Sequence, residues 1–276
     1  MFKNLQCVIL SILLHAAITH PSSVGFAEAQ GLRQTMEDAH CIEIGTDHAF
    51  FGLFDGHGGK QVADFAAKNL HKNILSFLQT NKFTINESLS NGFLKTHKDL
   101  DQEFFNIKDQ GCTAIAAFFK DGHLYVANAG DSRAVLSSAG KAIALSDDHK
   151  PTRPDEKKRI ENLGGKIITY GVPRVNGILA ISRALGDKAL YPFVIPNPEI
   201  KEKELITEDE LLIIACDGVW DVIDNQTAVD IVKKNLLAHQ ADYNKAATAL
   251  KDEALRCGST DNVSVMVINL KSFQKS

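Results

Sequence analysis

The chain has 276 residues, 44% hydrophobic and 23% charged, a composition typical of a soluble globular protein with one large domain or two small ones. A net charge of −4, with no stripe rich in Lys and Arg, argues against a nucleic-acid-binding surface. Its five cysteines form no Cys-x-x-Cys pair, so a zinc site is not expected.

Residues 1–22 differ in composition from the rest of the chain. A single Lys3 precedes the apolar run Cys7–Leu14, and small and polar residues follow. This is the layout of a secretory signal peptide, and the apolar run is too short to span a membrane. The alternative is an untargeted amino-terminal extension, in which case we expect the protein in the cytoplasm or nucleus. For residues 23–272 we expect a single domain.

The first half of the chain predicts strands followed by a pair of helices. Residues 24–29 alternate in the manner of a half-buried strand, and two further apolar runs follow a polar link. Apolar residues then recur at helical spacing in two segments with a short polar connection, which predicts an antiparallel helix pair packed on a sheet. The predicted strands are 24–29, 39–44 and 49–54, and the predicted helices lie around 62–78 and 89–104.

The second half predicts more strands, an irregular excursion and a second helix pair. Only short, turn-like links separate residues 113–119, 124–129 and 134–136, so we expect these three successive strands to be antiparallel neighbours. A long polar stretch rich in Gly and Pro predicts a functional surface flap with one short helix. The strands are 113–119, 124–129, 134–136, 211–215 and 263–270; the flap is 146–177, with its helix around 155–162; the later helices follow residue 228.

Strands in runs and helices in pairs favour an α+β fold over a doubly wound sheet. Two antiparallel β-sheets packed face to face, with a pair of antiparallel helices outside each, would bury every predicted apolar face. We therefore expect a four-layer α/β/β/α sandwich.

Three aspartates lie at the ends of predicted strands. Asp55 and Asp217 each follow an apolar strand and precede a glycine, and Asp261 stands just before the last strand. Each alone is most often a helix cap or turn former. Together with Glu37 and Asp38 they predict an acidic cluster, which repels itself unless a cation neutralises it. Oxygen ligands favour Mg²⁺ or Mn²⁺, and two such ions would activate a water for in-line attack.

Two further side chains suit phosphate chemistry. Arg33 lies on the same polar link as Glu37, and its planar guanidinium matches a phosphate, although a surface ion pair is the alternative. His57 follows Asp55 by two residues, where an imidazolium could give a proton to a leaving alkoxide. The alternative for His57 is a backbone-bonded histidine at a helix start.

Taken in order along the chain, these motifs resemble those of the type 2C (PPM) metal-dependent serine/threonine protein phosphatases. The most specific is Asp-Gly-His-Gly-Gly at residues 55–59. The resemblance covers nearly the whole chain from residue 24 to the last strand. The matching stretches are 29–40, 54–59, 111–114, 127–133, 148–151, 174–177, 182–187, 216–221 and 259–262.

The resemblance implies two Mg²⁺ or Mn²⁺ ions in the active site, with Asp55 bridging both. Asp217 and Asp261 would complete one site, and Glu37 with the carbonyl of Gly56 would complete the other. In such enzymes a water or hydroxide activated by the ions attacks the phosphoryl group in line, without a phosphoenzyme.

The resemblance also implies roles for side chains around the ions. Asp38 would orient the attacking water, Arg33 would bind the substrate phosphate, and His57 would be the general acid. A weaker third cation site would be formed by Asp131, Asp217 and Asp221.

Two other functions share part of this pattern. A calcineurin-like metallophosphoesterase also begins with Asp-x-His, but its later motifs are absent, since Gly130–Arg133 has the wrong spacing and no Gly-Asn-His occurs. A non-catalytic module that binds phosphoproteins would keep the same fold. For the enzyme we expect phosphoserine and phosphothreonine protein substrates, no nucleic acid, no membrane span, and a monomer.

Overall fold

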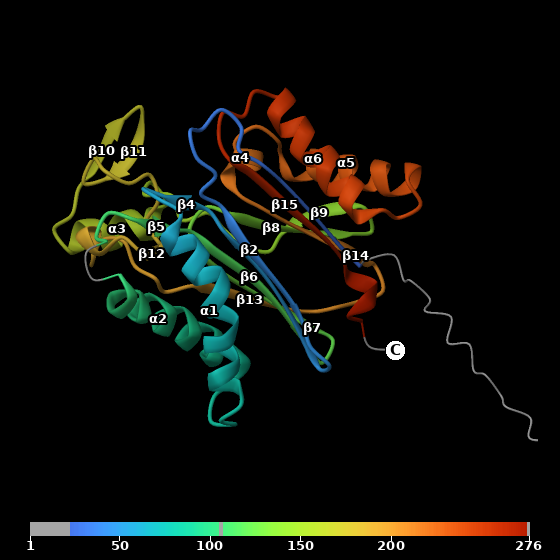
Figure 1. The fold of residues 1–276 in the computed structure, drawn as a ribbon, viewed down its shortest axis with the longest axis horizontal. Coiled ribbons are helices and arrows are strands. Elements are labelled where there is room, and N and C mark those ends of the chain that lie inside the picture. Colours follow the sequence, from blue (N-terminus) through green and yellow to red (C-terminus); the bar gives the residue numbers. More distant parts are fainter. Residues whose placement is uncertain (1–22, 105–106, 275–276) are drawn as a thin grey trace, which may run out of the picture.

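The computed structural model describes residues 23–104 and 107–274, which form four layers (Figure 1). Two five-stranded antiparallel sheets pack face to face, and a pair of helices covers the outer face of each. The predicted α/β/β/α sandwich is therefore confirmed.

The first sheet brings together strands from both ends of the chain. Helices α5 (Asn225–Ala238) and α6 (Tyr243–Arg256) cover its outer face. The side chains of Asp224 and Asp242 cap these helices by accepting hydrogen bonds from first-turn backbone N–H groups, which fixes where each helix begins. In spatial order its strands are β1 (Val24–Ala29), β15 (Val263–Asn269), β14 (Asp209–Ala215), β8 (Arg133–Ser138) and β9 (Lys141–Ala144).

The second sheet is covered by helices α1 (Gln61–Leu78) and α2 (Ile85–Glu103). A capping box at Thr84 and Glu87 starts α2, because each side chain accepts a hydrogen bond from the backbone N–H of the other residue. In spatial order its strands are β13 (Glu199–Glu204), β7 (His123–Ala129), β6 (Ala114–Lys120), β3 (His48–Phe54) and β2 (Ala39–Ile44).

Strand β3 is apolar throughout because both of its faces are covered. Phe51 and Leu53 point into the core between the two sheets, whereas Phe50 and Phe54 point into the core under α1 and α2. All four side chains are at most 1% exposed. This two-sided burial explains why the sequence shows a continuous apolar run rather than an alternation.

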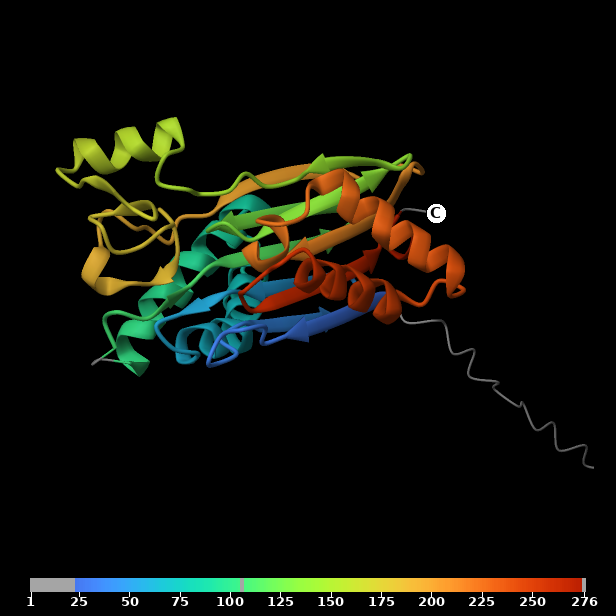
Figure 2. The ribbon, with the colours of Figure 1, turned by 90° about the horizontal axis from the view of Figure 1, so that it is seen from above.

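The excursion between β9 and β12 (Leu185–Gly186) forms the flap, residues 145–184, which extends beyond the predicted 146–177 and projects at one end of the sandwich in both views (Figures 1 and 2). It contains the predicted short helix, α3 (Pro154–Asn162), and a hairpin that the sequence analysis did not predict, β10 (Ile167–Tyr170) with β11 (Val172–Val175).

Short elements complete the fold near the flap and the strand ends. Strand β12 also pairs with β5, and β5 pairs with β4, to form a small three-stranded sheet. These elements are β4 (Gly56–His57), β5 (Gly111–Cys112), α4 (Asp217–Trp220) and the 3₁₀ helices η1 (Lys188–Leu190) and η2 (Leu270–Ser272).

One prediction about strand pairing was wrong. Strands β7 and β8 are joined by only three residues but lie in different sheets, and each pairs elsewhere. The chain passes from one sheet to the other at Gly130, whose φ of +129° is open to glycine but disfavoured for other residues. A short link therefore produced a crossing between sheets instead of a hairpin.

The first and last strands of the described chain, β1 and β15, pair at one edge of the first sheet. The backbone N–H of Asn269 donates a hydrogen bond of 2.7 Å to the carbonyl of Ser23. Residues 1–22, the predicted signal or extension, lie outside the described residues. Within the described ranges, no helix has the length and apolar character that crossing a membrane requires.

Candidate active site

A cavity of about 540 Å³ lies where strands of both sheets end beside the flap. Eight of the ten predicted site residues line it. Asp38 is buried beside Asp55 instead, and Asp221 lies outside the lining, one helical turn beyond Asp217. The eight lining residues are Arg33, Glu37, Asp55, Gly56, His57, Asp131, Asp217 and Asp261.

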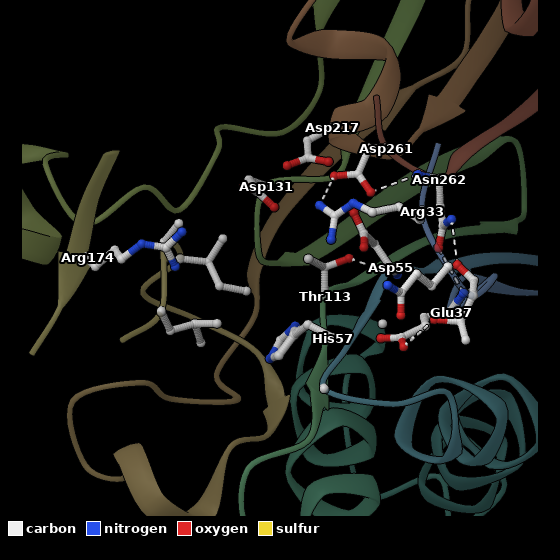
Figure 3. A pocket seen from close by; sticks show the side chains of 17 residues that line it. Arg33, Glu37, Asp55, His57, Thr113, Asp131, Arg174, Asp217, Asp261 and Asn262 are labelled. Carbon is white, nitrogen blue, oxygen red and sulfur yellow. Dashed lines mark hydrogen bonds and ion pairs between the residues drawn. The ribbon is translucent and has the colours of Figure 1, made fainter. Parts of the chain in front are cut away.

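The aspartates converge because their strands end at the same edge of the sandwich (Figure 3). Asp55 directly follows β3 of the second sheet. Asp217 begins α4 directly after β14, and Asp261 precedes β15, so both come from the first sheet. The cluster therefore combines residues at the strand ends of both sheets.

The polar link before β2 is held against the first sheet by Asn262. Its side-chain oxygen accepts a hydrogen bond of 2.8 Å from the backbone N–H of Glu37, and its NH₂ group donates to two backbone carbonyls of the link. The Glu37 carboxylate accepts hydrogen bonds from the backbone N–H of Gly59 at 3.0 Å and from the Thr35 hydroxyl at 2.8 Å. Glu37 is thereby fixed at the cavity wall.

Three buried aspartates of the cluster have a raised pKa, because burial and neighbouring negative charges disfavour the ionised carboxylate. Burial, and after it the charges of neighbouring aspartates, raises the pKa of Asp55 well above its usual range. The same causes raise the pKa of Asp217 to about 8. Burial also raises the pKa of Asp38 to about 6. A bound cation would offset the free-energy cost of ionising these buried carboxylates and would lower their pKa.

The donor set fits a divalent cation. Asp38 and Asp55 each offer a carboxylate oxygen, and these two atoms and Sγ of Cys216 lie within 4.8 Å of one another. The Cys216 thiol donates to the carbonyl of Asn262, so the carboxylates are the ligands suited to Mg²⁺ or Mn²⁺. Oδ2 of Asp38 accepts a hydrogen bond of 2.6 Å from the Ser264 hydroxyl, but its buried Oδ1 has no hydrogen-bond partner among the described residues. Because a buried carboxylate oxygen is rarely left without a partner, this atom indicates a missing ion or water.

Arg33 extends across the mouth of the cavity. One of its guanidinium nitrogens lies 2.5 Å from Oδ2 of Asp261, and its side chain remains 60% exposed. Arg33 therefore does form an ion pair, which was the alternative to phosphate binding. Its partner, Asp261, is itself one of the expected cation ligands. An exposed guanidinium next to the cluster remains accessible to an anionic ligand.

His57 is held by a partner that the sequence analysis did not identify. Both carboxylate oxygens of Asp187 lie 2.9 Å from Nε2 of His57, and the Asp187 side chain is only 4% exposed. This close approach requires Gly111, since a Cβ there would lie 2.0 Å from Oδ2 of Asp187. The contact leaves Nδ1 as the ring nitrogen that can serve a ligand.

Asp131 has an ion-pair partner within the chain. The ammonium of Lys150 pairs with its carboxylate, whose side chain is 4% exposed. Burial raises the pKa of Asp131, although the charge of Lys150 opposes this effect. Neither Lys150 nor Asp187 was assigned a role from the sequence, although both lie in stretches that matched the family motifs.

The flap supplies the far wall of the cavity. Arg174 points toward the carboxylates from β11 (Figure 3) and donates a hydrogen bond of 2.7 Å to the carbonyl of Ile178. Residues 179–181 line the wall beside it. The cavity thus combines an acidic floor with cationic side chains at its mouth and far wall, an arrangement suited to cations and a phosphate together.

The sequence matches known proteins over most of its length. The family model described as protein phosphatase 2C matches residues 22–263. A rice (Oryza sativa subsp. japonica) protein, "Probable protein phosphatase 2C member 13, mitochondrial", is 46% identical over 253 residues, which cover 88% of this chain and 67% of that protein. The Arabidopsis thaliana "Probable protein phosphatase 2C 76" is 42% identical over 259 residues, which cover 90% of this chain and 59% of that protein. The chain therefore spans only about 59–67% of the length of these relatives.

Solved structures agree with the sequence relatives. A phosphatase from Toxoplasma gondii superposes with a TM-score of 0.82 at 26% identity, covering 89% of this chain and 91% of that one. A Caenorhabditis elegans sex determining protein gives a TM-score of 0.85 at 26% identity, covering 90% of this chain and 64% of that one. From the family match and the relatives together, the chain belongs to the protein phosphatase 2C family.

Proposed function

We propose that this protein is a Mg²⁺- or Mn²⁺-dependent phosphatase that hydrolyses phosphoserine and phosphothreonine in proteins. The observation that carries the proposal is the convergence of buried carboxylates from both sheets at one cavity, with Arg33 and His57 beside them. Membership of the family supports the same activity. Protein substrates are favoured by the names of the relatives, which are called protein phosphatases.

The residues that would hold two ions are those predicted from the sequence. Asp55 would contact both; Asp217 and Asp261 would complete one site, and Glu37 with the Gly56 carbonyl the other. Bound divalent cations supply positive charge that stabilises the developing phosphoryl charge and makes water more acidic.

Each remaining side chain has a distinct task. Arg33 would bind phosphate oxygens through its exposed guanidinium, leaving its present partner Asp261. Oδ1 of Asp38, which has no hydrogen-bond partner among the described residues, would accept a hydrogen bond from the attacking water and orient it. Nδ1 of His57 would give a proton to the leaving serine or threonine oxygen, while Nε2 faces Asp187.

The test is phosphate release from a phosphothreonine peptide by the full chain, with EDTA, then with Mn²⁺ or Mg²⁺, with and without okadaic acid. Turnover that requires the metal and resists okadaic acid is the expected result. If the folded protein bound Mn²⁺ and the peptide but released no phosphate, the alternative of a phosphoprotein-binding module would replace the proposal.

The location and assembly of the protein are part of the proposal. We propose a single domain over residues 23–272 and a monomer, with residues 1–22 either a secretory signal or an untargeted extension of a protein of the cytoplasm or nucleus. The rice relative named as mitochondrial makes the mitochondrion the competing destination, beside cytoplasm and nucleus. Fractionation of cells that express the full chain or a chain lacking residues 1–22, each with a carboxy-terminal tag, distinguishes these locations.

A further inference from the structure

The flap hairpin has one face on a small core and one face in solvent. Val175 of β11 is fully buried and belongs to an apolar cluster with Ile160 of α3. A hairpin that is covered on one face normally alternates, with polar residues on its open face. Here the open face carries Ile168, Tyr170 and Val172, whose side chains are 47%, 80% and 48% exposed. Packing within the flap does not account for this apolar surface, and such surfaces mark binding sites.

The strand register places these three side chains on the same face as Arg174. In the antiparallel pair Tyr170 stands opposite Val172, and Ile168 stands opposite Arg174. Residues directly opposite one another share a face, and so do residues two apart along a strand. The apolar side chains therefore lie on the side of the hairpin that carries Arg174. We call the surface formed by Ile168, Tyr170 and Val172 the hairpin face.

Arg174 and the turn after β11 connect the hairpin face to the cavity. Arg174 lines the cavity, points toward the carboxylates (Figure 3) and donates its 2.7 Å hydrogen bond to the carbonyl of Ile178. The Ile178 side chain is 62% exposed, and residues 179–181 continue from it along the cavity wall. Ile168 lies beside the same turn, since its Cδ1 is 3.7 Å from the Cβ position of Gly177. An apolar surface thus continues from the hairpin face to the wall of the cavity.

We propose that the hairpin face binds a large apolar side chain of the substrate polypeptide, in the segment that flanks the phosphorylated residue. This inference rests on the proposed function, because it takes the cavity as the place where the phosphate binds. The occupant is the substrate because the face continues into the cavity wall and lies on the side that carries Arg174. Burial of an apolar side chain against Tyr170 and Val172 would favour substrates that have one.

The length of the hairpin predicts the position of this side chain in the substrate. Val172 stands two residues beyond Arg174 along β11, a rise of about 7 Å, and an extended substrate advances about 3.3 Å per residue. The hairpin face therefore begins roughly two residues beyond the part of the substrate that Arg174 contacts. We expect the apolar residue about three to five positions from the phosphothreonine.

Phosphate release by the full chain from matched phosphothreonine peptides tests the inference. In the test peptides a single leucine stands three, four or five positions from the phosphothreonine, on either side in turn, and the reference peptide has serine at these positions. For the best leucine peptide we expect kcat/KM about fivefold to tenfold above the reference, through a lower KM, because the contact is made equally in the ground state and the transition state. The double variant Tyr170→Ser, Val172→Thr should lose this preference and hydrolyse the reference peptide as the wild type does.

Matched controls separate this role from a general loss of structure. Leu237→Ser removes an apolar side chain that is 85% exposed on α5, and it should keep the full leucine preference. Tyr170→Phe keeps the aromatic ring and should keep the preference as well. Each variant is also assayed on an aryl phosphate, which has no flanking segment, and unchanged turnover there shows that the cavity is intact. If the double variant loses this turnover, Val172→Thr alone serves, because threonine keeps a β-branched side chain on the strand, and it should lower the preference in part.

The outcomes distinguish this inference from the proposed function. Wild-type protein that releases no phosphate from any peptide in the presence of Mn²⁺ or Mg²⁺ would overturn the proposed function, and this inference with it. Metal-dependent release without a preference for leucine at any position, or with a preference that survives in the double variant, would overturn the role of the hairpin face alone. Sedimentation velocity provides a further check. A wild-type dimer that the double variant converts to a monomer would assign the face to a second copy of the chain and overturn its role in substrate binding.

Discussion

Asp187 contacts His57, although the two residues are 130 positions apart in the sequence. Both carboxylate oxygens of Asp187 lie 2.9 Å from Nε2 of His57. The contact fixes the plane of the imidazole ring and makes Nε2 a proton donor to Asp187. The contact leaves Nδ1 as the ring nitrogen that the proposed general acid would use. Asp187 acts through His57, and its removal should impair only the reactions that need the histidine.

We predict that Asp187→Asn slows hydrolysis of a phosphothreonine peptide by about tenfold to a hundredfold, because a general acid contributes at least this much to a poor leaving group. Hydrolysis of an aryl phosphate, whose leaving group needs little protonation, should change far less. His57→Gln should show the same pattern, and the double variant should be no slower than His57→Gln. Equal losses on both substrates would contradict the assignment.

We expect Gly111→Ala to reproduce this pattern from another position. A Cβ at residue 111 would lie 2.0 Å from Oδ2 of Asp187 and 2.7 Å from Nε2 of His57, so the contact must open. The value of kcat should fall more for the phosphothreonine peptide than for the aryl phosphate. Gly164→Ala is a control, because no atom lies within 4 Å of its Cβ position, although its φ of +85° costs some stability. Gly164→Ala should keep the wild-type ratio of the two rates.

Removal of a proposed metal ligand should abolish activity at moderate metal concentration. Asp217→Asn removes one negative charge from the cluster. We predict that turnover falls by about a hundredfold at about 1 mM Mn²⁺ and recovers in part at higher Mn²⁺. Asp252→Asn, an exposed acid of α6, provides the control and should retain full activity. Wild-type turnover by Asp217→Asn would rule out the metal assignment.

The flap should lose stability in acid through Glu156. Although burial raises its pKa, hydrogen bonds from Arg183 and Arg159 outweigh this effect and lower the pKa to about 2. A carboxyl whose pKa is lower in the folded protein stabilises the fold above its unfolded pKa of 4.5, and this contribution is lost as the pH falls toward 2. Urea unfolding should show Glu156→Gln less stable than the wild type at pH 7, and the difference should shrink at pH 4 and below.

The matched control for this experiment lies on the same helix. Glu161 is exposed and its carboxylate lies 3.9 Å from Lys157, so Glu161→Gln should change stability little at any pH. A difference between wild type and Glu156→Gln that stayed constant from pH 7 to pH 3.5 would contradict the role of the carboxylate charge.

The core between the two sheets should be sensitive to the loss of Phe51. This side chain is fully buried and makes edge contacts with the rings of Phe119 and Phe273, at centroid distances of 5.6 and 5.8 Å. Phe51→Ala should lower the free energy of unfolding by about 3–5 kcal/mol. Phe83→Ala, at a ring that is 38% exposed, should cost about 1 kcal/mol or less. Similar costs for both variants in urea unfolding would contradict this placement of the core.

The sequence predicted those elements whose burial leaves a periodic pattern. The four long helices and the central strands appeared because each buries a stripe or both faces against a neighbour. Strand β13, with the sequence Glu-Ile-Lys-Glu-Lys-Glu, was missed because it lies at the edge of its sheet, paired only with β7, and carries charges. The crossing at Gly130 was missed because spacing alone does not distinguish a hairpin from a change of sheet.

The part of the site that could be predicted from the sequence is the part that lies at the ends of apolar strands. The carboxylates Asp55 and Asp217 stand where apolar runs stop, which sequence spacing reveals. Asp187 and Lys150 act by touching another side chain, His57 and Asp131, and those contacts follow from the tertiary packing rather than from any local pattern. The resemblance to a family supplied the surrounding stretches but no partner for either residue.

The hydrogen bond between Asn269 and Ser23 also has a topological consequence. Strand β1 starts and β15 stops side by side at the edge of the first sheet, and the opposite ends of both strands lie toward the acidic cavity. A linker could lead from Gln274, whose side chain donates to the carbonyls of Ile206 and Asp209, back to residue 23, and the ring could be reopened at the turn of residues 121–122 between β6 and β7. Such a circular permutant would retain every strand pairing and every carboxylate in place. Activity of such a permutant would show that the cavity requires the pairing of its strands and not their order along the chain.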